Sequence, residues 1–245
     1  ADQVKELYDY QKDYFLGSRS SVTLYKGHLG IGVAEPSGQL ELAGDERIQE
    51  YPPRAMTKNE TLVEGHGAFV AHGGITNTAY APWKAFDKST STFWVDVGVR
   101  YSDVTPFGAL STASKTTLYD GSVLSGGWID LECPYPVKLK RVGTAPRTNY
   151  SSIGLQRGII LGSNNGVDWY QIYTIDYAGT TPPNTLTYFD ITTETYYSHL
   201  RLVCTNLTAR YPVSGTSDMH WQMGELVYFG TPGPTTLDKG SLTLG

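Results

Sequence analysis

The stretch Lys84-Ala-Phe-Asp-Lys-Ser-Thr-Ser-Thr-Phe-Trp94 places a carboxylate, hydroxyls and a run of backbone carbonyls directly before an aromatic pair, Phe93-Trp94, that we expect to be buried. Hard oxygen ligands suit Ca²⁺, which takes about six to eight of them. One loop supplies too few, so we expect a further carboxylate from Gly224-Glu225-Leu226, where the last apolar run begins. The stretch therefore predicts a calcium site that joins the two ends of a domain. The predicted ligands are Lys84, Asp87, Ser89, Thr92, Gly224 and Glu225.

An ordinary polar turn is the alternative for this stretch. An Asp side chain often accepts hydrogen bonds from backbone N–H groups just after it in the chain, and it then holds a tight turn without any metal. Such a turn needs no partner from the C-terminal part of the chain. The distance between Asp87 and Glu225 in the folded protein therefore tests the cation site.

Alternating apolar residues beyond this stretch predict β-strands. Residues 126–142 alternate with period two on both sides of a segment that contains two prolines, and four side chains are expected in the core. These four are Ile129, Leu131, Val137 and Leu139. Residues 158–169 give strand, Asn-Gly turn and strand, which predicts a hairpin. Further strands are expected at residues 68–71, 170–177, 187–191, 196–204 and 223–230.

The opening stretch resembles a motif of the discoidin domains, which comprise factor V/VIII type C domains and the carbohydrate-binding modules that share their fold. The family segment is Ala-x-Asp-Gly-Asn-x-x-Thr-x-Trp, and the matching residues are Ala85, Asp87, Thr92 and Trp94. Lys88 and Ser89 stand where the family usually has Gly and Asn. Five landmarks in family order, including the Ser163–Trp169 turn and the closing Glu-Leu-x-x-Tyr strand, extend the resemblance over about residues 60–230. It implies an all-β, discoidin-like jelly-roll sandwich at residues 55–231.

The resemblance also implies loops at one end of the sandwich that hold sugars or lipid head groups. Sugar binding needs an aromatic face against the apolar side of a pyranose, with planar donors or acceptors for its hydroxyls. Three loops supply such groups, and the candidate residues are Tyr80, Trp83, Arg147, Asn149, Tyr150, Arg157, His220 and Trp221. Alternatively, Trp83 or Trp221 caps the core, Arg147 pairs with a surface carboxylate and His220 is a solvated loop residue. Lipid binding needs apolar spikes above a basic rim, which an acidic chain does not suggest.

The composition limits the class of protein. The 245 residues include 27 Gly and 18 Tyr but only 18% charged residues, as expected for a turn-rich β protein. The net charge of −5 argues against nucleic acid as the main partner. No apolar run is long enough to span a membrane, and the N-terminus lacks a signal-peptide pattern. We expect Cys133 and Cys204, which lie in alternating apolar runs, to be buried free thiols, with a disulfide between neighbouring strands as the alternative.

Sequence motifs of catalysis are missing. The chain has no Gly-x-Ser-x-Gly elbow, His-Glu-x-x-His, Cys-x-x-Cys or Walker loop, and its five histidines lack metal-ligand spacing. We therefore predict that the protein is not an enzyme. A glycoside-cleaving carboxylate pair stays open as an alternative, because its members can be far apart in the chain.

The two ends of the chain carry a repeat. Residues 235–245 agree with residues 22–32 at six of eleven positions, which suggests a module inserted between two connectors. Residues 3–15 have helical spacing, and short strands are expected at residues 22–44. The predicted organisation is a helix and connector at 1–45, a linker at 46–54 that contains Tyr51-Pro-Pro53, the sandwich at 55–231 and a second connector from 232.

These connectors resemble the stalk segments of phage and virus tail-fibre and spike proteins, where they form interwound trimers. Together with the sandwich and the Tyr51-Pro-Pro53 opening, they resemble surface proteins of large algal DNA viruses. The resemblance implies a non-catalytic module on a virion surface that binds cell-surface glycans for host attachment. Its further partners would be other virion proteins or copies of itself in a trimer. A purely structural role in capsid assembly is the alternative function.

Overall fold

The structure is a computed structural model. It describes residues 22–31, 35–37, 39–42, 47–74, 78–99, 101, 108–109, 114–147, 154–177, 184–208, 220–233 and 235–237. The chain forms two compact units, residues 1–46 with 232–245 and residues 47–231, here called the flank unit and the sandwich unit. The predicted helix at residues 3–15 lies outside the described residues. Within the described part of the chain, no helix has the length and apolar character that crossing a bilayer requires.

The flank unit contains one small sheet. Its strands are β1 (Val22–Tyr25), β2 (His28–Ile31), β3 (Leu40–Leu42) and β17 (Thr235–Leu237), in the order β1-β2-β3-β17. Lys26 and Gly27 join β1 to β2 with φ angles of 50° and 84°, and a two-residue turn with both φ angles positive matches the twist of a hairpin. The sheet thus brings the N-terminal connector next to β17, where the second copy of the repeat begins.

The sandwich unit is built almost entirely from strands, as predicted. These are β4 (Gln49–Tyr51), β5 (Glu60–Val63), β6 (Gly67–Gly73), β7 (Trp94–Asp96), β8 (Lys115–Thr117), β9 (Val123–Ser125), β10 (Gly127–Ala145), β11 (Leu155–Ser163), β12 (Tyr170–Asp176), β13 (Thr187–Asp190), β14 (Tyr197–Leu207), β15 (Trp221–Met223) and β16 (Glu225–Pro232). Two short 3₁₀ helices, η1 (Thr78–Tyr80) and η2 (Pro82–Ala85), precede the loop that leads to β7. The chain therefore belongs to the all-β class, as its alternating pattern predicts.

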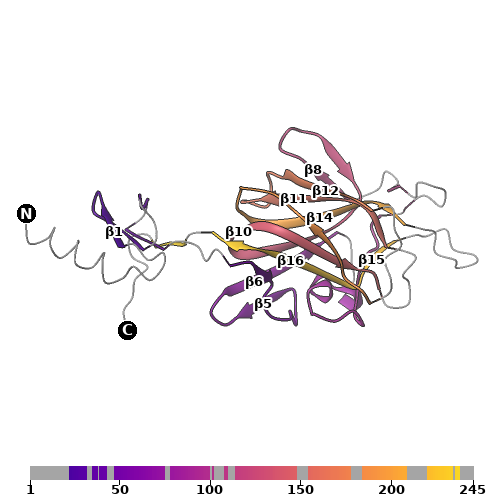
Figure 1. The fold of residues 1–245 in the computed structure, drawn as a ribbon. Helices are drawn as coiled ribbons and strands as arrows, with labels where there is room; N and C mark the ends of the chain where they lie inside the picture. Colours follow the sequence, from indigo (N-terminus) through magenta and orange to yellow (C-terminus); the bar gives the residue numbers. More distant parts are fainter. Residues whose placement is uncertain are drawn as a thin grey trace, which may run out of the picture. The chain divides into compact units, whose positions relative to one another are not determined.

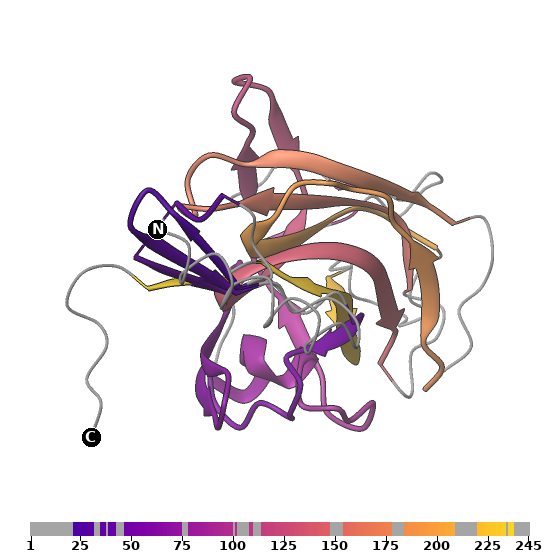
Figure 2. The ribbon, with the colours of Figure 1, turned by 60° about the vertical axis from the view of Figure 1, so that its left-hand side comes forward.

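The long strand β10 contributes to two layers. Its first half pairs with β14 on one side and β6 on the other, giving the layer β12-β11-β14-β10-β6-β5. Its second half pairs with β13 and lies beside β16, which pairs with β4. The pairing with β14 breaks between Glu132 and Val137, where Pro134 and Pro136 cannot donate backbone hydrogen bonds. Figures 1 and 2 show how strongly the long strands curve around the core.

The core lies between these layers. All four side chains predicted from the alternation of β10, Ile129, Leu131, Val137 and Leu139, are 0% exposed. They pack with Phe69, Trp94, Leu202, Leu226 and Tyr228 in one cluster. Cys133 and Cys204 are free and buried in the same cluster, as predicted. Burial raises the pKa of both thiols well above the usual value, so neither is a reactive thiolate.

The hairpin predicted at residues 158–169 is formed by β11 and β12. Its connection is longer than the Asn-Gly turn that we expected, because the paired residues Gly162 and Tyr170 leave seven residues between them, 163–169. The Asn165 side-chain oxygen accepts hydrogen bonds from the backbone N–H groups of Val167 (2.9 Å) and Asp168 (2.8 Å), and Gly166 has φ +70°. An Asn side chain that accepts from nearby backbone groups replaces a backbone turn.

The predicted linker at residues 46–54 is wrong. Residues 49–51 form β4, which pairs with β16, and Tyr51 is 0% exposed. The Tyr51 ring packs 6.4 Å from Phe69 and 6.2 Å from Tyr135, measured between ring centroids. The Tyr-Pro-Pro sequence resembles a stiff spacer, but its Tyr is an anchor in the core. The sandwich unit therefore begins at residue 47 instead of 55.

A second, smaller apolar cluster lies on the outer face of the β12-β11-β14-β10 layer. It contains Ile159, Leu161, Trp169 and Val203, with Leu118, Leu124 and Trp128 packed against it. Leu118 and Leu124 belong to the β8–β9 hairpin, which therefore packs against this face. The Tyr119 N–H donates to the Trp169 carbonyl at 2.9 Å. The segment between Trp94 and β10 thus contains the short strands β8 and β9.

Candidate functional site

The predicted carboxylate pair exists. The backbone N–H of Ser89 lies 3.0 Å from Asp87 Oδ1 and 3.0 Å from Glu225 Oε2, so one hydrogen is shared between the two side chains. The Thr92 hydroxyl lies 2.5 Å from Asp87 Oδ2 and 3.1 Å from the Ser89 carbonyl. Two carboxyl groups that are far apart in the chain therefore lie side by side, as the predicted cation site requires. The bond from the Ser89 N–H to Asp87 Oδ1 is also the one that the polar-turn alternative predicts.

Local backbone geometry aims this loop at Glu225. Lys88 has φ +59°, in the left-handed region that favours glycine, and this explains why the discoidin motif usually has Gly there. In this conformation the N–H groups of Lys88 and Ser89 both bind the Glu225 carboxyl group, as successive N–H groups do in anion-binding backbone nests. The Lys88 ammonium group pairs with Glu50 and donates to the Pro52 carbonyl at 3.0 Å.

The electrostatics of the carboxylate pair favour a cation. Burial raises the pKa of Asp87, although hydrogen bonds from Thr92 and Ser89 oppose the shift. Burial, together with the charge of Asp87, raises the pKa of Glu225 to about 8. Two desolvated carboxyl groups that share one donor, with the Thr92 hydroxyl and the Ser89 carbonyl beside them, form a hard oxygen donor set that fits Ca²⁺. In the described part of the chain, three or more His, Cys, Asp or Glu side chains nowhere gather in a metal-binding group.

Lys84 and Gly224 are the two remaining predicted ligands. Lys84 lies within η2, where its N–H donates to the Ala81 carbonyl, and its ammonium group donates to the Ala79 carbonyl at 2.7 Å. Gly224 directly precedes Glu225, and its N–H donates to the Ala145 carbonyl at 3.0 Å. Only their carbonyl oxygens can serve as ligands, since the Lys84 side chain is a cation.

A second group of side chains includes Phe93 and Gln222, which lie close in sequence to Asp87 and Glu225. The Arg147 guanidinium lies over the Phe93 ring, 3.6 Å from its centroid, and its Nη1 donates to Gln222 Oε1 at 3.0 Å. The Tyr80 ring lies 5.0 Å from the Phe93 ring at an interplanar angle of 30°. We call Tyr80, Phe93, Arg147 and Gln222 the Phe93 cluster. All four residues are partly exposed.

Strand pairing explains why Phe93 and Gln222 face outward. β7 and β15 pair in the register Met223–Trp94 and Gln222–Val95. The indoles of Trp94 and Trp221 meet edge to face in the core, with ring centroids 5.1 Å apart. Gln222 lies between two buried residues of β15, so the alternation of a strand turns its side chain the other way.

Two sequence predictions are corrected here. Trp221 is 1% exposed and belongs to the core, so it does not contact a ligand. Phe93, which we expected inside with Trp94, is partly exposed and lies under Arg147. The sequence analysis missed both Phe93 and Gln222 as site residues. The signal that could have found them is the period-two alternation around the two tryptophans.

The other predicted sugar-binding residues lie elsewhere or outside the described residues. Trp83 is half-buried and packs against the core, and the Lys84 ammonium group lies 5.7 Å from its ring centroid. His220 Nδ1 lies 2.8 Å from the Val99 carbonyl. Arg157 is exposed on β11, where it pairs with Asp176 and Asn206 of neighbouring strands. Asn149 and Tyr150 lie outside the described residues.

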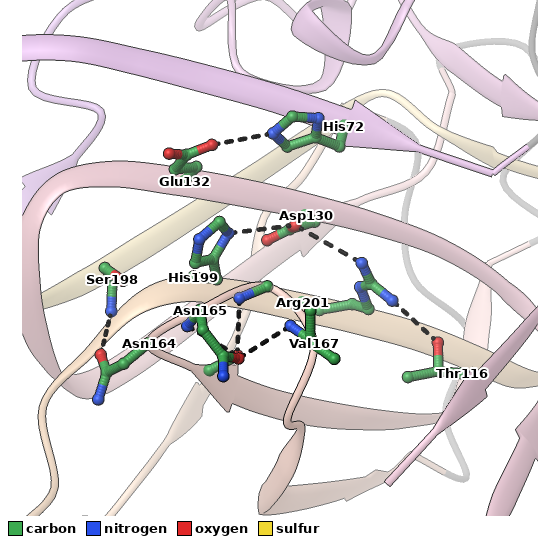
Figure 3. Close-up of polar contacts among 12 residues, drawn as sticks. His72, Thr116, Asp130, Glu132, Asn164, Asn165, Val167, Ser198, His199 and Arg201 are labelled. Carbon is green, nitrogen blue, oxygen red and sulfur yellow. Dashed lines mark hydrogen bonds and ion pairs between the residues drawn. The ribbon is translucent and has the colours of Figure 1, made fainter.

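The outer face of the sheet carries a polar cluster that the sequence analysis missed, and Figure 3 shows Asp130, His199, Arg201 and Thr116 together. The Arg201 guanidinium lies between the Trp128 and Trp169 rings, 3.8 Å from each centroid. Its Nη2 is 3.6 Å from Asp130 Oδ2, and its Nη1 donates to Thr116 Oγ1 at 3.2 Å. We call Asp130, Arg201 and their neighbour His199 the outer-face cluster. Because Thr116 lies on β8, this cluster fastens the β8–β9 hairpin to the sheet.

Strand register also sets these polar contacts. Asp130 of β10 lies opposite Arg201 of β14, and Glu132 lies opposite His199. His199 Nδ1 is 3.6 Å from Asp130 Oδ2, and Asp130 raises the pKa of His199. Burial lowers the pKa of Arg201 to about 10 despite the nearby carboxylate. The side chains of Asp130 and Arg201 are only 3% and 11% exposed, which indicates a structural role.

A scan against protein-family models gives no match, and a search of curated proteins gives no match either. Among solved structures, the module CBM32-3 of a family 31 glycoside hydrolase from Clostridium perfringens is similar with a TM-score of 0.46 and 14% identity, over 65% of this chain and 88% of that chain. CBM62 of Xyl5A from Clostridium thermocellum gives 0.43 and 20%, over 66% of this chain and 94% of that chain. The family 32 module of NanJ from C. perfringens, in complex with galactose, gives 0.42 and 14%, over 66% and 93%.

Proposed function

We propose that the sandwich unit is a non-catalytic carbohydrate-binding module and that the Phe93 cluster is its binding surface. The observation that carries this proposal is the Arg147 guanidinium, which is stacked on the Phe93 ring and hydrogen-bonded to Gln222 on a partly exposed surface. Tyr80 adds a second ring next to Phe93. These groups are an aromatic surface, a planar cation and a planar amide, which are the groups that a pyranose needs.

The chemistry of this surface suits a sugar. Aromatic rings bind the apolar face of a pyranose, while guanidinium and amide groups donate to and accept from hydroxyls in fixed planes. Contacts with Phe93 and Gln222 already hold the Arg147 side chain. A side chain that is held before binding loses less conformational entropy when the ligand arrives.

Arg147→Ala is the first test. A glycan array identifies the strongest saccharide, and isothermal titration then measures its affinity. Loss of a charged hydrogen-bonding group costs about 1.5–3 kcal/mol, so we expect the affinity to fall about tenfold to hundredfold. The control is Arg157→Ala, which removes an exposed arginine on β11 and should leave the affinity unchanged. Equal affinities for wild type and Arg147→Ala would contradict the proposal.

The carboxylate pair supports a non-catalytic role. Glycosidases place two carboxyl groups about 5–10 Å apart on either side of the bond to be cleaved. Here Asp87 and Glu225 share one backbone N–H at 3.0 Å each, and Glu225 is 3% exposed. Such a pair leaves no room for a glycosidic bond between its members. The alternative of glycoside cleavage therefore gains no support from this pair.

For the carboxylate pair we propose a Ca²⁺ site. Asp87, Glu225 and the Thr92 hydroxyl would hold the ion, with the carbonyl oxygens of Lys84, Ser89 and Gly224. An ion that binds only the folded form stabilises it by mass action. We expect Ca²⁺ to raise the melting temperature measured by differential scanning fluorimetry, and excess chelator to lower it. Asp87→Asn and Glu225→Gln should each remove this difference, whereas Asp190→Asn, at an exposed carboxylate, should keep it. Equal melting temperatures in Ca²⁺ and in excess chelator would refute the site.

A second candidate function is self-association through the flank unit. The register of β1 and β2 pairs Val22 with Ile31 and Leu24 with Leu29, so these four side chains share one face. They are 37–75% exposed, whereas Thr23, Tyr25, His28 and Gly30 on the other face are partly or fully buried. An apolar face that points to solvent is typical of an interface. We propose that copies of this chain bury it in an oligomer, and that a virion surface protein uses such a stalk to present its glycan-binding modules.

The double variant Leu24→Ser with Leu29→Ser tests self-association. We expect the wild-type chain to sediment as an oligomer, with a trimer as the proposed state, and the variant to sediment as a monomer. The matched control is Leu62→Ser, which changes a leucine of the sandwich unit that is 77% exposed. A monomeric wild type at micromolar concentration would refute the proposal. An unchanged oligomer in the double variant would place the interface elsewhere.

A further inference from the structure

We propose that the carboxylate pair and the Phe93 cluster act as one coupled unit, so that a divalent cation held by Asp87 and Glu225 controls the affinity for saccharide at the Phe93 cluster. This inference rests on the proposed function and adds a regulation to it. Three structural connections between the two groups carry it, and each joins one member of the Phe93 cluster to the loop around the carboxylate pair.

The first connection runs through the loop before β7. The Thr92 hydroxyl contacts Asp87 Oδ2 at 2.5 Å, and Phe93 is the next residue. Thr92 also contacts the Ser89 carbonyl, and Ser89 is the residue that bridges the two carboxyl groups. A change in the distance between Asp87 and Glu225 therefore moves the residue directly before Phe93.

The second connection runs through β15 to the start of β16. Gln222 lies three residues before Glu225, and Met223 between them is buried and paired with Trp94. The Trp94 and Trp221 indoles lock the two short strands together in the core. Protein interiors are closely packed. We therefore expect a displacement of Glu225 to move β7 and β15 together.

The third connection reaches Arg147. The Gly224 N–H donates to the Ala145 carbonyl at 3.0 Å, and a Cβ at Gly224 would lie 2.8 Å from the Pro146 carbonyl oxygen. Residues 145–146 are therefore packed directly against the residue that precedes Glu225. Arg147 follows them and reaches back to Gln222 and Phe93. Three residues of the Phe93 cluster are thus close to the carboxylate pair along the chain or through one contact. Phe93 follows the 87–92 loop, Gln222 precedes Glu225 by three residues, and Arg147 follows the two residues that pack on Gly224.

The direction of the coupling follows from the ties between the loop and the start of β16. Without a cation, the 87–92 loop is held to Glu225 by backbone N–H groups such as that of Ser89. A cation bound by Asp87, Thr92 and Glu225 would add a further tie between the two segments. It would thereby fix Phe93 in the position where the Arg147 guanidinium stacks on its ring. Because coupling between two sites is reciprocal, saccharide must strengthen cation binding by the same factor.

The experiment uses the full chain and the saccharide with the strongest glycan-array signal. Isothermal titration measures its affinity in millimolar Ca²⁺ and in excess chelator, and we expect a loss of about fivefold or more without the cation, the range typical of coupled sites. Titrating Ca²⁺ in the presence of saturating saccharide should show a gain of the same factor. Glu225→Gln and Asp87→Asn should make the saccharide affinity independent of Ca²⁺, whereas Asp190→Asn should behave as wild type. Melting curves confirm that each variant is folded. If either Glu225→Gln or Asp87→Asn does not fold, the other still tests the coupling.

Three results would overturn the inference, and they point to different failures. If saccharide binds equally well with and without Ca²⁺ while Ca²⁺ still raises the melting temperature, both sites exist but are uncoupled. If Ca²⁺ changes neither quantity, the carboxylate pair holds no cation. If no saccharide on the array binds in either condition, the proposed function fails with the inference. A loss of affinity in chelator that Glu225→Gln removes supports the coupling.

Discussion

Arg201→Ala is expected to lower the free energy of unfolding by about 3–5 kcal/mol, because removing one partner of a buried ion pair leaves the other charge uncompensated. The remaining partner is Asp130, whose side chain is 3% exposed. The substitution also empties the space between the Trp128 and Trp169 rings, each 3.8 Å from the guanidinium. It further removes the donor to Thr116, so the β8–β9 hairpin loses its polar contact with the sheet.

Urea unfolding followed by tryptophan fluorescence measures this loss. The matched control is Arg141→Ala, because Arg141 of β10 pairs with Asp190 of β13 in an exposed ion pair. Exposed pairs contribute little, so this control should unfold close to wild type. The double variant Arg201→Met with Asp130→Leu should recover most of the loss, since apolar residues of similar volume replace a buried pair well. If Arg201→Ala and Arg141→Ala unfold alike, the outer-face cluster does not stabilise the sheet.

The sequence predicted the features that depend on local spacing. The core side chains of β10 follow from period-two alternation, which a strand imposes wherever one face is buried. The meeting of Asp87 with Glu225 followed from a motif whose loop residues have fixed positions. The hairpin of β11 and β12 followed from its Asn-Gly signal, although the Asn165 and Ser163 side chains support a longer connection.

The features that the sequence did not predict depend on which strands become neighbours. Asp130 and Glu132 alternate with core residues, and such a pattern ordinarily indicates a solvent-facing side. Only the pairing of β10 with β14, covered by β8 and β9, buries Asp130 against Arg201. Tyr51 was misassigned for a similar reason, because the strand β4 exists only through its pairing with β16. Propensity within one segment carries no information about such long-range partners.

Trp221→Ala is the second substitution with a large expected effect, a loss of about 3–5 kcal/mol in the free energy of unfolding. The Trp221 indole is 1% exposed and packs edge to face on Trp94 at a centroid distance of 5.1 Å. Removing it leaves a cavity beneath the β7–β15 pair, which cannot close without moving Trp94. Trp221→Phe keeps an aromatic ring there and should cost clearly less.

This prediction separates a core residue from a ligand contact. If Trp221 lay on a loop and stacked on sugar, Trp221→Ala would weaken binding and leave the melting temperature near that of wild type. The control Tyr119→Ala removes an aromatic ring that is 66% exposed, and it should change the melting temperature little. If Trp221→Ala melts at the wild-type temperature, Trp221 is not a core residue and its side chain lies at the surface. That result would also remove the packing that turns Gln222 outward, and with it the basis for the Phe93 cluster as a binding surface.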